Sequence, residues 1–143
     1  MRVPRLFHLV MRFAFVVPVA AVADPGAPDP VKKEHAVAAK LPPAAARPID
    51  FERDIQPLFE ASCTKCHAKG KDKGGFSIET RAAFLKGGDT GPAAVPGKSA
   101  ESLVVELVAA SDQDEVMPKK GTHWTPQQVG LLRAWIDQGL PWP

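Results

Sequence analysis

The amino-acid sequence predicts an all-α protein with about four short helices. Two observations lead to this fold class. Four segments between residues 49 and 143 carry helix-boundary signals, and no stretch alternates apolar and polar residues as a strand would. The segment 49–143 has roughly 95 residues, enough for an adequate but small apolar core. We therefore expect one folded all-α domain over residues 49–143.

The first two predicted helices lie on either side of the two cysteines of the chain. The stretch "IQPLFEAS" predicts a short helix that Asp54 caps, with Pro57 in its first turn, where a missing amide proton costs nothing. The stretch "SIETRAAFLKGG" predicts a second helix, and Gly87 ends it because glycine readily adopts the conformation at a helix C-terminus. Both helices therefore flank the loop that follows the cysteines.

The last two predicted helices form the C-terminal part of the domain. The stretch "SAESLVVELVAA" predicts a helix that begins at Ser99. The fourth helix has the clearest boundaries, because Thr125 and Gln128 have the spacing of a capping box and Gly139 marks the end. Its apolar stripe predicts a face in the core, and Trp135 lies beside that stripe. The stripe consists of Val129, Leu132 and Ile136.

The N-terminus resembles an export signal. A basic stretch without acidic residues precedes an apolar run over residues 13–23, which ends in Ala-Val-Ala, a small-x-small cleavage site. The run is interrupted by Pro18 and is too short to span a bilayer. We expect a cleaved signal peptide over residues 1–23, no membrane span afterwards, and a periplasmic or other extracytoplasmic location. Residues 24–48 are rich in proline and alanine and predict an extended tether.

The charge balance excludes one class of partner. The chain has 18 basic and 16 acidic residues, and three of the basic ones lie in the predicted signal peptide, so 15 remain against 16. A protein with this balance has no net positive charge to attract nucleic acid. We expect no nucleic-acid partner.

The sequence "CTKCH", from Cys63 to His67, allows several interpretations. A thioredoxin-like switch needs a βαβ context, which the helical pattern does not provide. Structural zinc needs four ligands, and Cys66 and His67 are adjacent, which makes a shared tetrahedral ion difficult. A disulfide would close a very small loop. Cys-x-x-Cys-His is also the attachment sequence for c-type haem: Cys63 and Cys66 would form two thioether bonds to one haem, and His67 would bind its iron. This interpretation uses all three residues.

A second iron ligand is expected in the segment "DEVMPKKG". Met117 is the one methionine outside the predicted signal peptide, and Pro118 favours an extended backbone at Met117. A thioether is a soft ligand, and a Met/His pair raises the haem potential. The rival ligand is His123, and the other interpretation of Met117 is a core side chain that fills a gap.

At this point the sequence resembles the planctomycete cytochrome c domain family. The motifs that carry the resemblance are "DFERDIQPLFEASCTKCH", "GFSIETRAAFLKGG", "VPGKSAESLVVELV", "MPKKG" and "LLRAWIDQGLPWP", and they cover nearly all of residues 49–143. The resemblance implies a small cytochrome c-like fold around one covalent haem c, with Cys63 and Cys66 bonded to the haem, His67 proximal and Met117 distal. Ala68 stands where such sequences often have glycine. The family's domain also often heads a longer chain, whereas this sequence stops at Pro143, so we expect any partner to be a separate protein.

These features predict an electron carrier and not an enzyme. Both axial positions would be filled, so that the iron cycles between two oxidation states. The alternative is a haem-based gas or redox sensor, or a small haem enzyme, with a displaceable sixth ligand. Four lysines between Lys65 and Lys73 either form a positive rim for an acidic redox partner or keep a solvated loop soluble. Trp124 either donates its indole N–H to a haem propionate or packs at the surface.

Overall fold

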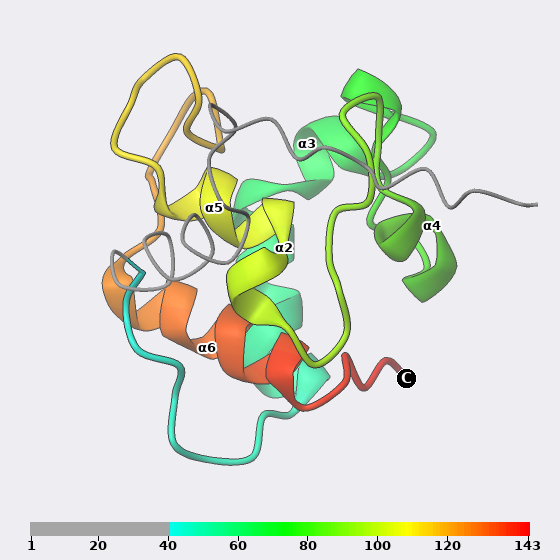
Figure 1. Ribbon diagram of the computed structural model, residues 1–143. Coiled ribbons are helices and arrows are strands. Elements are labelled where there is room, and N and C mark those ends of the chain that lie inside the picture. The colour runs from blue at the N-terminus through cyan, green and yellow to red at the C-terminus, as the bar shows by residue number, and fades with distance from the viewer. Residues whose placement is uncertain (1–40) are drawn as a thin grey trace, which may run out of the picture.

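The computed structural model describes residues 41–143, so the predicted signal peptide and residues 24–40 of the predicted tether lie outside the described residues. The α-helices are α2 (Gln56–Ser62), α3 (Thr64–His67), α4 (Arg81–Lys86), α5 (Leu103–Ala109) and α6 (Pro126–Asp137). Shorter helical turns are η1 (Phe51–Ile55), η2 (Lys73–Gly75) and η3 (Ser99–Glu101). Between residues 41 and 143 there is no strand, which confirms the predicted all-α fold class (Figure 1).

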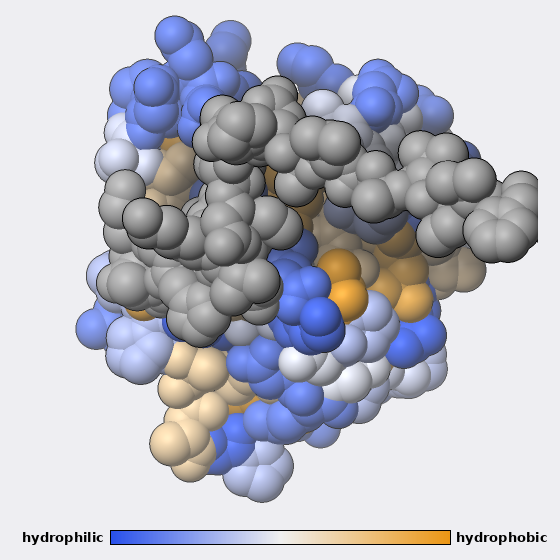
Figure 2. All heavy atoms as spheres, in the orientation of Figure 1, coloured by the Kyte–Doolittle hydropathy of each residue, from blue (hydrophilic) through white to orange (hydrophobic). Residues whose placement is uncertain are grey.

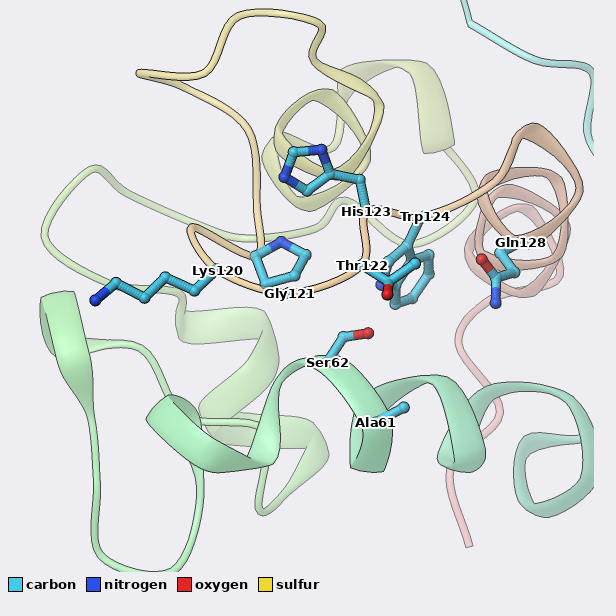
Figure 3. A pocket seen from close by; sticks show the side chains of 9 residues that line it. Ala61, Ser62, Lys120, Gly121, Thr122, His123, Trp124 and Gln128 are labelled. Carbon is cyan, nitrogen blue, oxygen red and sulfur yellow. The ribbon is translucent and has the colours of Figure 1, made fainter.

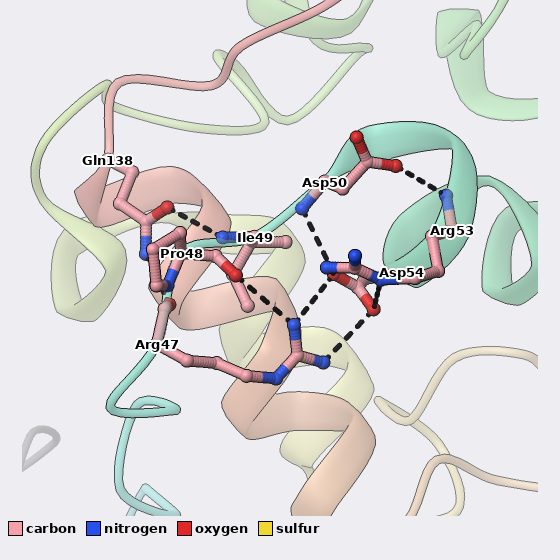
Figure 4. Close-up of polar contacts among 7 residues, drawn as sticks. All are labelled: Arg47, Pro48, Ile49, Asp50, Arg53, Asp54 and Gln138. Carbon is pink, nitrogen blue, oxygen red and sulfur yellow. Dashed lines mark hydrogen bonds and ion pairs between the residues drawn. The ribbon is translucent and has the colours of Figure 1, made fainter.

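The first helical segment begins earlier than predicted. Asp50 is the N-cap of η1, and its carboxylate accepts a hydrogen bond from the Arg53 amide at 2.8 Å. The prediction that Asp54 caps this helix is therefore wrong. The Asp54 carboxylate is buried and accepts hydrogen bonds from the guanidinium groups of Arg47 and Arg53 and from the Asp50 amide (Figure 4). Asp54 is thus a bridge between segments and not a local cap.

The second and third predicted helices are shorter than expected. Helix α4 begins after Thr80, whose hydroxyl accepts from the Ala83 amide, and it ends at Gly87 as predicted. Gly87 has a φ of 74°, and a Cβ there would lie 2.0 Å from the Gly91 carbonyl oxygen, so a glycine is required. The third helix is divided, because Ser99 belongs to η3 and α5 begins only at Leu103.

Helix α6 confirms its prediction closely. The Thr125 hydroxyl accepts from the Gln128 amide at 3.2 Å, and the Gln128 side chain accepts from the Thr125 amide at 2.8 Å, which completes the capping box. The apolar stripe faces the core, where Trp135 is fully buried. Helix α6 packs against η1, η3 and α5 and crosses the lower part of the fold in Figure 1.

The core is built around a cluster of aromatic rings. The rings of Phe51, Phe59, Phe84, Trp135 and Trp142 contact one another with centroid separations between 4.6 and 6.2 Å. They come from η1, α2, α4, α6 and the C-terminal segment, so the cluster joins the first and last helices of the fold to α4. Outside this core the visible face is mostly hydrophilic, with apolar atoms in a recess near its centre (Figure 2).

Residues 41–48, the last part of the predicted tether, pack against the domain in the structure. The Ala45 amide donates to the Gly130 carbonyl at 2.9 Å, and the Gln138 side chain donates to the Arg47 carbonyl at 2.9 Å. Arg47 also pairs with Asp54 at 2.8 Å. Among residues 41–143, no helix is long and apolar enough to cross a bilayer.

Candidate haem site

The sequence Cys-x-x-Cys-His forms one helical turn at the end of α2. The amides of Cys66 and His67 both donate to the Cys63 carbonyl, at 3.1 and 2.9 Å. This turn holds both thiols and the imidazole close together on a short, continuous piece of backbone. Cys66 is exposed, whereas Cys63 is half-buried and packs against the core. No disulfide joins the two cysteines, so the geometry leaves both available for thioether bonds to a haem.

The surroundings of Cys63 do not suit a dithiol redox switch. Burial raises the pKa of its thiol to about 12. The reactive cysteine of such a switch has a lowered pKa, because the thiolate is the nucleophile. The pair also lies in an all-α segment without the βαβ context of thioredoxin-like proteins. The structure therefore gives no support to the dithiol-switch interpretation.

His67 is held by the loop that follows it. Its Nδ1 lies 3.2 Å from the Phe76 carbonyl oxygen, and the two rings lie 5.0 Å apart. The Ile78 amide donates to the His67 carbonyl at 2.9 Å, which fixes the loop to the helix end. In a neutral imidazole, a proton on Nδ1 that is donated to this carbonyl leaves the Nε2 lone pair available to a metal, as is typical of metal-ligating histidines. The residues present thus fit a haem iron.

The sequence did not predict the Phe76 carbonyl as part of this site. Phe76 lies nine residues after His67, and a main-chain oxygen has no signature in a sequence. The glycines before it provide the only hint. Gly74 and Gly75 both have φ near 70°, and they allow the loop to return toward the histidine.

The four lysines near the attachment site are all exposed. They are Lys65, Lys69, Lys71 and Lys73. Acidic groups lie among them, since the Glu79 carboxylate accepts from the Lys69 amide at 2.8 Å and Asp72 is part of the same loop. The surface around the attachment site therefore carries mainly positive charges, with two acidic residues among them.

Met117 lies on the loop that joins α5 to α6. Its amide donates to the Leu107 carbonyl at 2.9 Å, and the side chain is half-buried against the same core that Cys63 contacts. Val116 beside it is buried. These contacts bring Met117 and Cys63 to one core, although the two are far apart in the sequence.

A pocket of about 210 Å³ lies between the end of α2 and the loop 118–124 (Figure 3). Ser62, which directly precedes Cys63, and Pro118, which directly follows Met117, both line it. His123 and Trp124 also line it. The pocket thus lies between the two segments that the sequence identified as candidates for holding a haem.

Comparison with known proteins agrees with this site. Residues 63–121 match the planctomycete cytochrome C family, and the matched segment begins at Cys63 and includes Met117. No curated protein and no solved structure matches the chain. The family consists of c-type cytochromes, whose usual role is electron transfer, and the spacing of Cys63 and Cys66 is that of haem attachment. Residues 63–121 are therefore a planctomycete cytochrome C domain.

Proposed function

We propose that this protein is an exported monohaem c-type cytochrome that transfers single electrons between redox partners. One haem would be bonded covalently to Cys63 and Cys66, with His67 and Met117 as axial ligands. The observation that carries the proposal is the contact between His67 Nδ1 and the Phe76 carbonyl, because it presents Nε2 of the same ring as a ligand. When bound, the haem iron supplies a one-electron Fe(III)/Fe(II) couple.

The residues of the chain have distinct tasks in this proposal. The two thiols fix the position of the haem edge by covalent bonds. The Phe76 carbonyl orients the imidazole of His67 and increases its basicity. The thioether of Met117 raises the potential relative to a second imidazole, since sulfur favours the reduced iron. The half-burial of Met117 against the core supports this role, because a fixed ligand resists displacement.

His123 remains the rival for the sixth position. It lines the same pocket as Ser62, but its ring points away from α2 (Figure 3). Met117 is favoured because its amide donates to the Leu107 carbonyl and its side chain packs against the same core as Cys63. An imidazole ligand would give a lower potential.

The sequence and the exposed side chains also support a partner and a location. The exposed lysines between Lys65 and Lys73 support an acidic docking patch on a redox partner. Export is supported by the sequence of residues 1–23, which resembles a signal peptide. It also agrees with haem attachment, because bacterial c-type haem is attached to the protein outside the cytoplasm.

Spectroscopy of the purified full-length protein tests this proposal. We expect a haem that acidified organic solvent does not extract and a reversible one-electron titration. Because both axial positions are filled, carbon monoxide added to the reduced protein should leave the spectrum unchanged. Free thiols at both cysteines, after expression in a host that matures c-type cytochromes, would exclude covalent attachment. Rapid binding of carbon monoxide would instead favour the sensor or enzyme alternative.

A further inference from the structure

Charge is distributed unevenly along the folded domain. Residues 63–86 contain six basic and two acidic residues, a formal net charge of +4. Residues 101–117 contain five acidic residues and no basic one, a formal net charge of −5. Lys119 and Lys120 follow directly and reduce this charge to −3 over residues 101–120. We call residues 63–86 the basic segment and residues 101–117 the acidic segment.

The charged side chains of both segments lie at the surface. The exposed cations of the basic segment are Lys65, Lys69, Lys71, Lys73, Arg81 and Lys86. The acidic segment exposes, besides Glu101, the carboxylates of Glu106, Asp112, Asp114 and Glu115. Glu101 pairs with Lys98, but none of the others takes part in an ion pair between described residues. Their charges therefore act on whatever approaches the surface.

The two segments lie on different sides of the candidate haem site. In Figure 1, α3 and α4 of the basic segment are drawn in green on the right, and α5 with the loop after it is drawn in yellow on the left. In Figure 3 the yellow loop lies above the pocket, and α2, which leads into α3, lies below it. His67 belongs to the basic segment and Met117 to the acidic one. With these two as axial ligands, which rests on the proposed function, the haem edge lies at the border between positive and negative surface.

We propose that this face binds a second copy of the chain in a weak two-fold dimer, in which the basic segment of each copy meets the acidic segment of the other. In a two-fold interface the same surface is used by both copies, and a contact from one patch to another occurs twice. A face with one positive and one negative side is complementary to itself in this arrangement, whereas a face of one sign would repel its own copy. Each exposed ion pair contributes little, so the dimer is transient, as electron-transfer encounters often are.

The dimer has a consequence for electron transfer. Because each candidate haem site lies between the two charged segments, the dimer brings the sites of both copies toward each other. One electron would then pass from a reduced copy to an oxidised one, with no bond changed and no proton moved. The acidic patch that the exposed lysines favour in a partner is thus present on the chain itself.

Sedimentation equilibrium of the full-length, haem-loaded protein, at up to about 1 mM, measures the association. The Debye length is about 30 Å at about 10 mM NaCl and about 4 Å at about 0.5 M, so the association constant should fall at least about tenfold over this range. At low salt the average mass should rise with concentration toward that of two chains. The mass of a single chain at every concentration, association that salt does not weaken, or growth beyond two chains by head-to-tail assembly would overturn the proposal.

Charge reversal tests the pairing of the two segments. One variant has three lysines of the basic segment replaced by glutamate, and the other has three acidic residues of the acidic segment replaced by lysine. The substitutions are Lys69→Glu, Lys71→Glu and Lys73→Glu in the first variant, and Glu106→Lys, Asp114→Lys and Glu115→Lys in the second. Each variant should lose association, because like charges then meet.

The chain that carries all six substitutions is the decisive variant, because it has the net charge of the parent protein. Each reversed segment again meets its opposite, so this chain should regain association. Glu52→Lys, an exposed charge reversal in η1 outside both segments, is the control and should associate like the parent protein. Circular dichroism identifies any variant that does not fold, and glutamine then replaces the introduced charges. A folded chain with all six substitutions that stays monomeric, or equal loss in Glu52→Lys, would contradict the pairing.

Electron exchange between copies gives a second readout, which rests on the proposed function. In a half-reduced sample, the broadening of haem methyl signals in NMR spectra reports the rate of exchange. Added salt should slow this exchange, whereas for a face of one sign it would speed it by screening the repulsion. A rate that rises with salt would contradict the facing arrangement. Sedimentation requires no electron transfer, and the absorption spectrum reports whether haem is attached, so failure of the proposed function is distinguishable.

Discussion

The substitution Asp54→Asn tests the polar cluster that ties residues 41–48 to the first helical segment. The Asp54 carboxylate accepts from Arg47 at 2.8 and 3.0 Å, from Arg53 at 2.8 and 3.1 Å, and from the Asp50 amide at 3.0 Å (Figure 4). These hydrogen bonds hold the pKa of the Asp54 carboxyl well below its usual range, with the Arg47 bond the largest cause. Asparagine keeps the shape but removes the charge.

The structure sets the size of the effect. Hydrogen bonds to a buried charge contribute about 1.5–3 kcal/mol each when fully shielded. The side chains of Arg47 and Arg53 are 45% and 66% exposed, so water screens both pairs and reduces their contributions. We therefore expect Asp54→Asn to lower the free energy of unfolding by about 1–2 kcal/mol at pH 7.

The pH dependence has a definite sign. A carboxyl with a lowered pKa in the folded state stabilises the fold above its unfolded pKa of about 3.9. That contribution decreases as the pH falls further, because protons then bind the unfolded chain first. The difference between the parent protein and Asp54→Asn should thus be constant near neutral pH and shrink between about pH 4 and pH 2.

Urea unfolding of the haem-loaded protein, followed by circular dichroism, measures this difference. Urea is preferable to guanidinium, which would screen the ion pairs. The matched control is Asp50→Asn, because it removes one negative charge at the same helix start while asparagine caps a helix equally well. If both variants lose the same stability, or if the loss at Asp54 does not depend on pH, the cluster does not act as described.

Three further variants test other parts of the structure. Gly130→Ala should detach residues 41–48 and increase their cleavage by proteases, since a Cβ there would lie 2.6 Å from the Pro43 carbonyl oxygen; unchanged cleavage would refute the contact. Thr125→Ala removes the N-cap of α6 and should lower the free energy of unfolding, measured in urea, by about 1 kcal/mol. A decrease below a few tenths of a kcal/mol would show that the cap is dispensable. Cys63→Ala combined with Cys66→Ala should abolish haem attachment and lower the melting temperature, because the haem fills volume next to the core; equal melting temperatures would mean that the core is complete without it.

Local signals predicted some elements well because their causes are local. The capping box of α6 depends on residues three apart, and the end of α4 depends on the backbone of Gly87, so both can be predicted from short stretches. Asp54 is of a residue type that often caps helices, but its carboxylate bonds to Arg47, a residue in the predicted tether. No local pattern distinguishes a cap from such a tertiary contact, and for this reason that prediction failed.

The same distinction applies to the site. Cys63, Cys66 and His67 could be identified because haem attachment requires them in one short motif. The Phe76 carbonyl that orients His67 and the partnerless indole of Trp124 depend on how loops fold back, and neither has a sequence pattern of its own. Ser99 shows the same effect in the fold, since its amide and hydroxyl donate to the Asp137 carboxylate of α6 and do not cap α5.

The axial ligation by His67 and Met117 is tested most directly by carbon monoxide binding to the reduced forms of Met117→Ala and His123→Ala. The account predicts that Met117→Ala binds carbon monoxide and has a lower potential than the parent protein, because the thioether ligand is lost. His123→Ala should resemble the parent protein in both properties, since His123 only lines the neighbouring pocket. Carbon monoxide binding by His123→Ala, together with none by Met117→Ala, would contradict the assignment of Met117 and with it the proposal of a high-potential electron carrier.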